Sequence, residues 1–226
     1  MAERLATSES PGRGELRALL VVALLTGLAL RLIGLSYPPF DDHSFRQCQT
    51  LWTIEDFHAR GIDLLHPRTN YVGYPQTFVL ELPLFQALMA LWYGWFGAHV
   101  EIVRLWNIGM GLGTVWLLYR ITSYLFGRMA ATWTAVIYWL APLNIIYQRS
   151  TLLDPTAVLL ALISFDQLAR LLGVGRGAEL ESGLNRSTGR RALGWAVLAV
   201  TTWTVALIKT LYLWPMVCLL AWRWWG

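Results

Sequence analysis

The chain has 226 residues, of which 56% are hydrophobic and 14% are charged, whereas about a quarter of the residues in a soluble domain are charged. Its apolar runs are long enough to cross a bilayer, so the composition predicts an all-α, polytopic membrane protein and argues against a soluble core. The net charge of +4 comes from basic residues scattered between these runs. Without a compact basic domain, we expect no nucleic acid as a partner.

The first apolar run predicts an uncleaved membrane span over residues 16–35. It is longer than the apolar region of a typical signal peptide, and no small-residue cleavage site follows it. The polar residues 1–14 are expected to form a disordered cytoplasmic tail. Residues 15–226 would then form one transmembrane domain, whose first external loop covers residues 36–78 and carries short interfacial helices.

The start of this loop, "YPPFDDHSFRQCQT", concentrates Asp41, Asp42, His43 and Arg46 beside the predicted span. Charged side chains close to hydrocarbon are costly and commonly functional, and a carboxylate here could accept a proton from a reacting hydroxyl. The alternative is that the acids are solvated loop residues and that Asp42 or Ser44 caps the helix that follows. We favour the functional interpretation because four ionisable groups fall within six residues.

Arginines mark cytoplasmic loops, which places the turn from Arg120 to Arg128 and the N-terminal Arg13 and Arg17 on the inner side of the membrane. The segment 79–97 must then begin and end on the outer side. We therefore expect an interfacial or re-entrant helix there, while a true span, which would move the Arg120–Arg128 turn outside, is the alternative. About six or seven spans are predicted, at residues 16–35, 105–125, 129–147, 154–171, 193–209 and 210–224, with 79–97 as the seventh if it crosses.

This topology gathers the polar residues next to the spans on the outer face of the membrane. Lys209 is the single lysine among 18 basic residues, and a compact cation between two apolar runs suits the phosphate of a lipid. Arg46, Arg104 and Arg149 could instead be interfacial residues whose charged ends reach water. Asp154 could be a helix N-cap in front of Pro155, or could form a polar cluster with Arg149. The candidate site residues are Asp41, Asp42, His43, Arg46, Glu81, Arg104, Arg149, Asp154 and Lys209.

Metal-ligand spacing is not evident in the sequence. Cys48 and Cys218 lie far apart, and His58 and His66 have no ligand-spaced partners. We therefore predict no metal site, although a divalent metal is left open as a cofactor.

Several strings occur in an order that resembles a known family: "ARGIDLLHPR", "ELPLFQALMALWYGWFG", "VRLWN", "YQRSTLLDP" and "LIKTLYLWP". Together with the acidic pair after the first span, they resemble the N-terminal half of the protein mannosyltransferase-like family. These are glycosyltransferase family 39-type enzymes of the GT-C class, which also includes the lipid A aminoarabinose transferases. The resemblance covers roughly residues 17–220.

The resemblance implies an inverting glycosyltransferase in the membrane that uses a polyprenyl-phosphate-linked sugar. The catalytic acid of the family falls on Asp41 or Asp42, of which Asp41 is preferred because it begins the D-x-H-S-x-R-Q pattern. Many members have aspartate followed by glutamate where this chain has two aspartates. The family's loop glutamate before proline matches Glu81, its arginine and "LLD" motif matches Arg149 and Asp154, and its phosphate-side lysine matches Lys209 loosely.

We thus expect transfer of a hexose or pentose to an unknown acceptor on the outer, periplasmic face of a bacterial plasma membrane. Members of the class are roughly twice as long or more, so the chain is expected to be incomplete, and a non-catalytic subunit is one alternative. A transporter or flippase for a lipid-linked substrate is the other. It is disfavoured because the polar groups collect on one face and no matching pair of broken spans is evident.

Overall fold

A computed structural model describes residues 12–39, 43–70, 75–77, 81–173 and 188–225. These residues fold mostly into helices, and the described ranges contain nine α-helices and two strands of three residues each. The predicted all-α class is therefore confirmed, apart from the short strands. Helix α1 (Arg13–Leu32) includes the last two residues of the predicted tail, and residues 1–11 lie outside the described residues.

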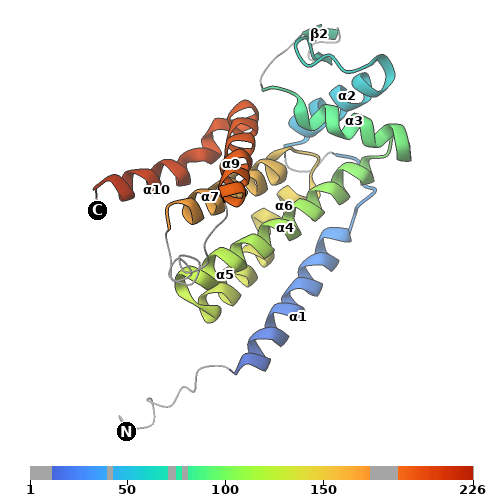
Figure 1. Ribbon diagram of the computed structural model, residues 1–226. Coiled ribbons are helices and arrows are strands. Elements are labelled where there is room, and N and C mark those ends of the chain that lie inside the picture. Colours follow the sequence, from blue (N-terminus) through green and yellow to red (C-terminus); the bar gives the residue numbers. More distant parts are fainter. Residues whose placement is uncertain (1–11, 40–42, 71–74, 78–80, 174–187, 226) are drawn as a thin grey trace, which may run out of the picture.

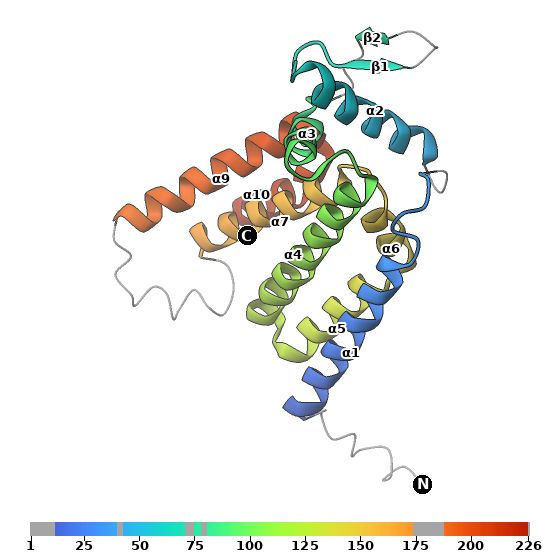
Figure 2. The same cartoon turned by 90° about the vertical axis from the view of Figure 1, so that its right-hand side faces the viewer.

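The first three long helices of the bundle lie side by side (Figures 1 and 2). Helix α4 (Val100–Phe126) ends at Gly127, and α5 (Arg128–Leu140) turns back along both α4 and α1. Gly127 has φ of 95°, a conformation that glycine adopts without the steric cost that a side chain would bring. The chain can therefore reverse between α4 and α5 within one residue.

The helix predicted over 129–147 is broken in two. Helix α5 ends at Leu140, and α6 (Pro142–Arg149) leaves at an angle of 59°. Proline has no backbone N–H and forces the preceding residue out of the helical region, and Ala141 accordingly has ψ of 125°. For this reason the predicted span 129–147 is a bent pair of helices and not one continuous helix.

The second half of the bundle is built from helices after α6. Helix α7 (Asp154–Leu171) packs against α4 and against α9 (Thr188–Lys209). The 3₁₀ helix η2 (Thr210–Leu213) then leads into α10 (Trp214–Trp225). The bounds of α7 agree with the prediction of 154–171, whereas the predicted span 210–224 begins with the 3₁₀ turn.

The predicted first external loop and the segment after it form a cap at the end of the bundle away from the start of α1 (Figures 1 and 2). The cap contains α2 (Ser44–Arg60), the antiparallel strands β1 (Arg68–Asn70) and β2 (Pro75–Thr77), and α3 (Leu84–Phe96). Buried apolar side chains of α2 and α3 pack together, among them Ile54, Phe57, Met89 and Tyr93.

Helix α3 occupies most of the segment whose membrane topology was left open. It has 13 residues, which at about 1.5 Å per residue span about 20 Å, less than the ~30 Å of a hydrocarbon core. Among the described helices, α9 is long and apolar enough over Ala192–Lys209 to cross a membrane, and α5 with α6 would be a second if the bent pair were one span. The other described helices do not meet this standard.

A buried arginine ties three helices of the bundle together. Arg31 of α1 is fully buried, and its guanidinium donates to Gln148 Oε1 at 2.8 Å and to the Trp139 carbonyl at 2.9 Å. It also stacks on the Trp139 ring, with 3.6 Å from Cζ to the ring centroid. Since a buried cation without partners would be very costly, these contacts fix α1 against α5 and α6.

Candidate functional site

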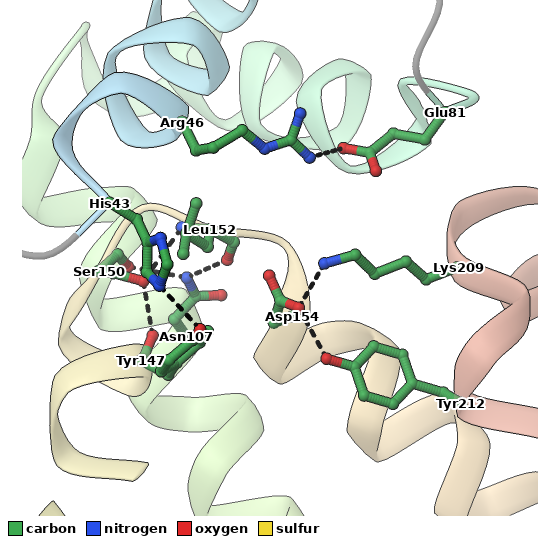
Figure 3. Close-up of polar contacts among 10 residues, drawn as sticks. All are labelled: His43, Arg46, Glu81, Asn107, Tyr147, Ser150, Leu152, Asp154, Lys209 and Tyr212. Carbon is green, nitrogen blue, oxygen red and sulfur yellow. Dashed lines mark hydrogen bonds and ion pairs between the residues drawn. The ribbon is translucent and has the colours of Figure 1, made fainter. Parts of the chain in front are cut away.

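Four of the predicted site residues come together beneath the cap (Figure 3). Arg46 comes from α2, Glu81 from the segment before α3, Asp154 from the start of α7 and Lys209 from the end of α9. The backbone N–H of Leu82 donates to the Leu207 carbonyl at 3.3 Å, which holds the Glu81 segment against the end of α9. Residues far apart in the sequence therefore form one cluster.

Asp154 accepts two hydrogen bonds from the C-terminal part of the chain. Lys209 Nζ lies 2.5 Å from Asp154 Oδ1, and the Tyr212 hydroxyl donates to the same oxygen at 2.7 Å. Asp154 is 9% exposed. The predicted N-cap role is wrong, because α7 begins at Asp154 itself and Leu153 is its N-cap residue. Asp154 does belong to a polar cluster, but its ion-pair partner is Lys209, whereas the predicted partner Arg149 donates to the Ile33 carbonyl.

Arg46 and Glu81 form the second ion pair of the cluster, with 3.1 Å from Arg46 Nη2 to Glu81 Oε1. Burial raises the pKa of the Glu81 carboxyl, and the positive charges of Arg46 and Lys209 oppose this rise. Lys209 and Asp154 are thus near enough to act on Glu81 electrostatically. The cluster contains two cations and two acids in one partly buried environment.

His43 lies beside this cluster and has an unusual backbone conformation. It is the N-cap residue of α2, with φ of 56° and ψ of 33°, a left-handed conformation that costs a residue other than glycine roughly 1–2 kcal/mol. Its Nε2 lies 3.0 Å from the Tyr147 hydroxyl of α6. Ser44 does not have the predicted cap role, because it is the first residue of α2 and His43 holds the N-cap position. Asp41 and Asp42 lie outside the described residues.

A turn that precedes Asp154 is fixed by two buried side chains. Asn107 of α4 donates to the carbonyls of Ser150 and Leu152 at 2.9 and 2.7 Å. Gln47 of α2 accepts from the Thr151 N–H at 3.1 Å. These contacts join α2, α4 and the start of α7, and they orient Asp154 toward Lys209.

Arg104 and Arg149 bind the backbone of the segment that links α1 to the cap. Arg104 is 1% exposed, and its Nη1 donates to the carbonyls of Leu35 and Tyr37, both at 2.7 Å. Arg149 Nη1 donates to the Ile33 carbonyl at 3.2 Å. Both predicted residues therefore bind the backbone of the segment that leads to the acidic pair.

Sequence reasoning missed Tyr147, Tyr212, Asn107 and Gln47. Each contacts a predicted site residue or the turn before Asp154, yet none has a local pattern that distinguishes it from other polar residues. Within the described ranges, no group of three or more His, Cys, Asp or Glu side chains could hold a metal ion.

No protein-family model, curated protein or solved structure matches this chain. The chemistry of the site is therefore argued from its own residues. Arg46, Lys209 and the Tyr212 hydroxyl are hydrogen-bond donors that face two carboxylates. An anionic ligand could compete with Glu81 and Asp154 for these donors, since phosphate oxygens accept the same charge-assisted hydrogen bonds as carboxylates do.

Proposed function

We propose that the chain is a membrane glycosyltransferase, or the catalytic N-terminal part of one, of the protein mannosyltransferase-like GT-C type. It moves a sugar from a polyprenyl-phosphate donor to an acceptor at the outer face of a bacterial plasma membrane, with inversion. The observation that carries the proposal is the cluster of Arg46, Glu81, Asp154 and Lys209. These residues were candidates from the sequence, and they come from four separate segments of the fold.

A membrane location is supported by where the polar and apolar side chains lie. Arg31, Arg104 and Asp166 are at most 1% exposed, while large apolar side chains point outward. In a bilayer the polar groups of a helical bundle face its interior and apolar groups face lipid. The outward-facing apolar residues include Val22 and Leu25 of α1, Trp116 of α4, Ile137 of α5, and Val200 and Trp203 of α9.

The distribution of exposed apolar side chains supports the polytopic topology of the proposal. Helix α4, with 27 residues, is about 40 Å long and would cross the bilayer. Helix α3 would lie at the outer interface with the rest of the cap, because its buried face packs on α2. Its exposed Trp95 and Phe96 are residue types that favour the headgroup region.

The proposed reaction is a direct displacement at the anomeric carbon of the donor. The acceptor oxygen forms a bond to this carbon, its proton passes to the carboxylate of Asp41, and the polyprenyl phosphate leaves with the electron pair of the broken C–O bond. Lys209 and Arg46 stabilise the charge that develops on the phosphate, which is expected to be the larger contribution. Glu81 and Asp154 hold these two cations in place before the donor binds.

The test uses the purified chain in proteoliposomes with a panel of radiolabelled polyprenyl-phosphate hexoses and pentoses, and total bacterial membranes as the acceptor pool. We expect Asp41→Asn to lower transfer by about 10²–10⁴-fold, the usual range for losing a general base. Asp63→Asn is the matched control, because Asp63 is an exposed acid of the same loop that binds the N–H groups of Leu65 and His66. It should transfer sugar at the wild-type rate.

Two other outcomes have defined meanings. Full activity of Asp41→Asn together with an inactive Asp42→Asn would assign the base to Asp42. Donor turnover that is absent from the wild type for the whole panel, or unchanged in both variants, would overturn the proposal.

A further inference from the structure

A cavity at the opposite end of the bundle from the cluster has a strongly basic rim. It has a volume of about 330 Å³ and lies between α1, α4 and α5, helices that lie side by side in Figure 2. Its lining residues are Arg13, Leu16, Arg17, Leu20, Tyr119, Ser123, Arg128 and Thr132. The volume falls within the range of small-ligand sites, about 300–1,000 Å³.

The lining residues are spaced so that each helix presents them on one face. Arg13 and Arg17 are four residues apart on α1, as are Tyr119 and Ser123 on α4, and residues at this spacing are neighbours on a helix surface. Arg128 is the first residue of α5. Three helices thus direct three guanidinium groups and several hydroxyl groups to one cavity.

The ionic contacts of these three arginines differ from those of other arginines in this half of the molecule. Among the described residues, no acidic side chain forms an ion pair with Arg13, Arg17 or Arg128. By contrast, Arg120 and Arg170 in the same half of the molecule both pair with Asp166. Three like charges around a cavity repel one another, so a bound anion would stabilise this arrangement.

We infer that this cavity is a binding site for a phosphate-bearing anion. Guanidinium groups bind phosphate oxygens through paired hydrogen bonds, and the hydroxyl of Tyr119 or Ser123 can donate to the remaining oxygens. Leu16 and Leu20 give one wall an apolar surface, which fits the glycerol and first carbons of a phospholipid. The ligand is therefore either an anionic phospholipid headgroup or free phosphate. The inference does not depend on the proposed transferase reaction.

The experiment measures thermal unfolding of the full chain in neutral detergent by tryptophan fluorescence. The probes are dihexanoyl phosphatidylglycerol, inorganic phosphate and dihexanoyl phosphatidylcholine, all at one ionic strength. A ligand at about 100 times its Kd shifts unfolding measurably, and we expect a rise in Tm of about 5 °C. A rise with phosphatidylglycerol alone identifies a lipid site, and an equal rise with inorganic phosphate identifies a free-anion site.

The variants separate the cavity from general positive charge. Arg17→Gln/Arg128→Gln should lose the ligand-induced rise, while Arg17→Lys/Arg128→Lys, which keeps the charge, should retain part of it. The matched control is Arg68→Gln/Arg223→Gln, which removes the same charge from two exposed arginines outside the cavity and should keep the full rise. An equal loss in the control, or equal shifts with phosphatidylcholine and phosphatidylglycerol, would overturn the inference.

Discussion

Glu81 is the site residue whose ionisation is most affected by its surroundings. Burial raises the pKa of its carboxyl above the ordinary value of 4.5, although Arg46 and Lys209 favour the charged form. Between pH 4.5 and the raised pKa, the folded protein binds a proton at Glu81 that the unfolded chain has lost. The free energy of unfolding must therefore fall as pH rises through this window.

This relation predicts how Glu81→Gln changes the pH dependence of stability. The Tm of the wild type minus the Tm of Glu81→Gln should be largest at about pH 4.5 and should decrease toward neutral pH. Thermal unfolding of both proteins at steps of half a pH unit measures this difference. Asp63→Asn is a control with the opposite pH dependence, because hydrogen bonds from the backbone N–H groups of His66 and Leu65 lower the pKa of Asp63 below 3.8. The wild type should lose stability relative to that variant as pH falls below about 3.8. Parallel curves for the wild type and Glu81→Gln would contradict the prediction.

The sequence could predict which residues of the site carry charge but not their partners. Lys209 was selected because it is the single lysine and lies between apolar runs, and its proximity to Asp154 was not foreseen. Tyr212 lies 58 residues from Asp154 in the sequence, and Tyr147 lies 104 residues from His43. Such contacts depend on how η2 packs on α7 and how α6 packs on the start of α2, and no local pattern around a tyrosine encodes them.

At the scale of the helices, α4 packs through a glycine against the buried Arg31 network, which consists of Arg31, Trp139 and Gln148. A Cβ at Gly111 would lie 2.3 Å from Gln148 Oε1, the atom that accepts from Arg31, whereas a Cβ at Gly109 meets nothing within 4 Å. Both positions are glycines of the same helix, but only Gly109 has room for an added methyl group.

Alanine at these two glycines should act in opposite directions. Gly111→Ala should lower the free energy of unfolding by about 1–3 kcal/mol, the usual cost of overpacking. Gly109→Ala should raise it by roughly 0.5–1 kcal/mol, because alanine favours helix over glycine. Denaturant unfolding followed by circular dichroism measures both. Equal effects of the two substitutions would show that Gln148 moves aside freely and that the Arg31 network does not fix the helices.

Secondary structure was predictable where apolar periodicity and helix-breaking residues agree. The bounds of α7 were correct, and those of α4 differed by a few residues. The break at Pro142 was missed because the apolar run continues through it, although the proline itself was a visible signal. The strands β1 and β2 were missed because three residues are too few to show an alternating pattern.

At the scale of the molecule, opposite ends carry different kinds of charged group. The cap end holds the cluster of paired acids and bases, whereas the other end holds Arg13, Arg17 and Arg128 around a cavity. The arginine bias in the sequence had assigned these three residues to one side of the membrane, and the fold brings them together. Counting the predicted spans from these arginines had assigned the site residues to the other side of the membrane, and four of them meet beneath the cap.

This polarity predicts the membrane sidedness of three positions. Helix α4 is about 40 Å long, so the residues that flank it should lie on opposite sides of a bilayer. Single cysteines would be introduced at Ala98, Phe126 and Gly14, after the exposed Cys48 and Cys218 are replaced by serine. All three positions are exposed, so a membrane-impermeant maleimide can report the side on which each one lies.

We expect Ala98→Cys to react in intact spheroplasts, whereas Phe126→Cys and Gly14→Cys should react only after the membrane is permeabilised. Gly14 and Phe126 belong to the same end of the bundle, so they must label alike if the bundle crosses the bilayer as a unit. If Ala98→Cys reacts only from the cytoplasm, then α3 belongs to a membrane-crossing segment and the interfacial position of the cap is wrong. If all three react without permeabilisation, α4 does not cross the membrane, and no bilayer separates the Arg46–Glu81–Asp154–Lys209 cluster from the arginine cavity.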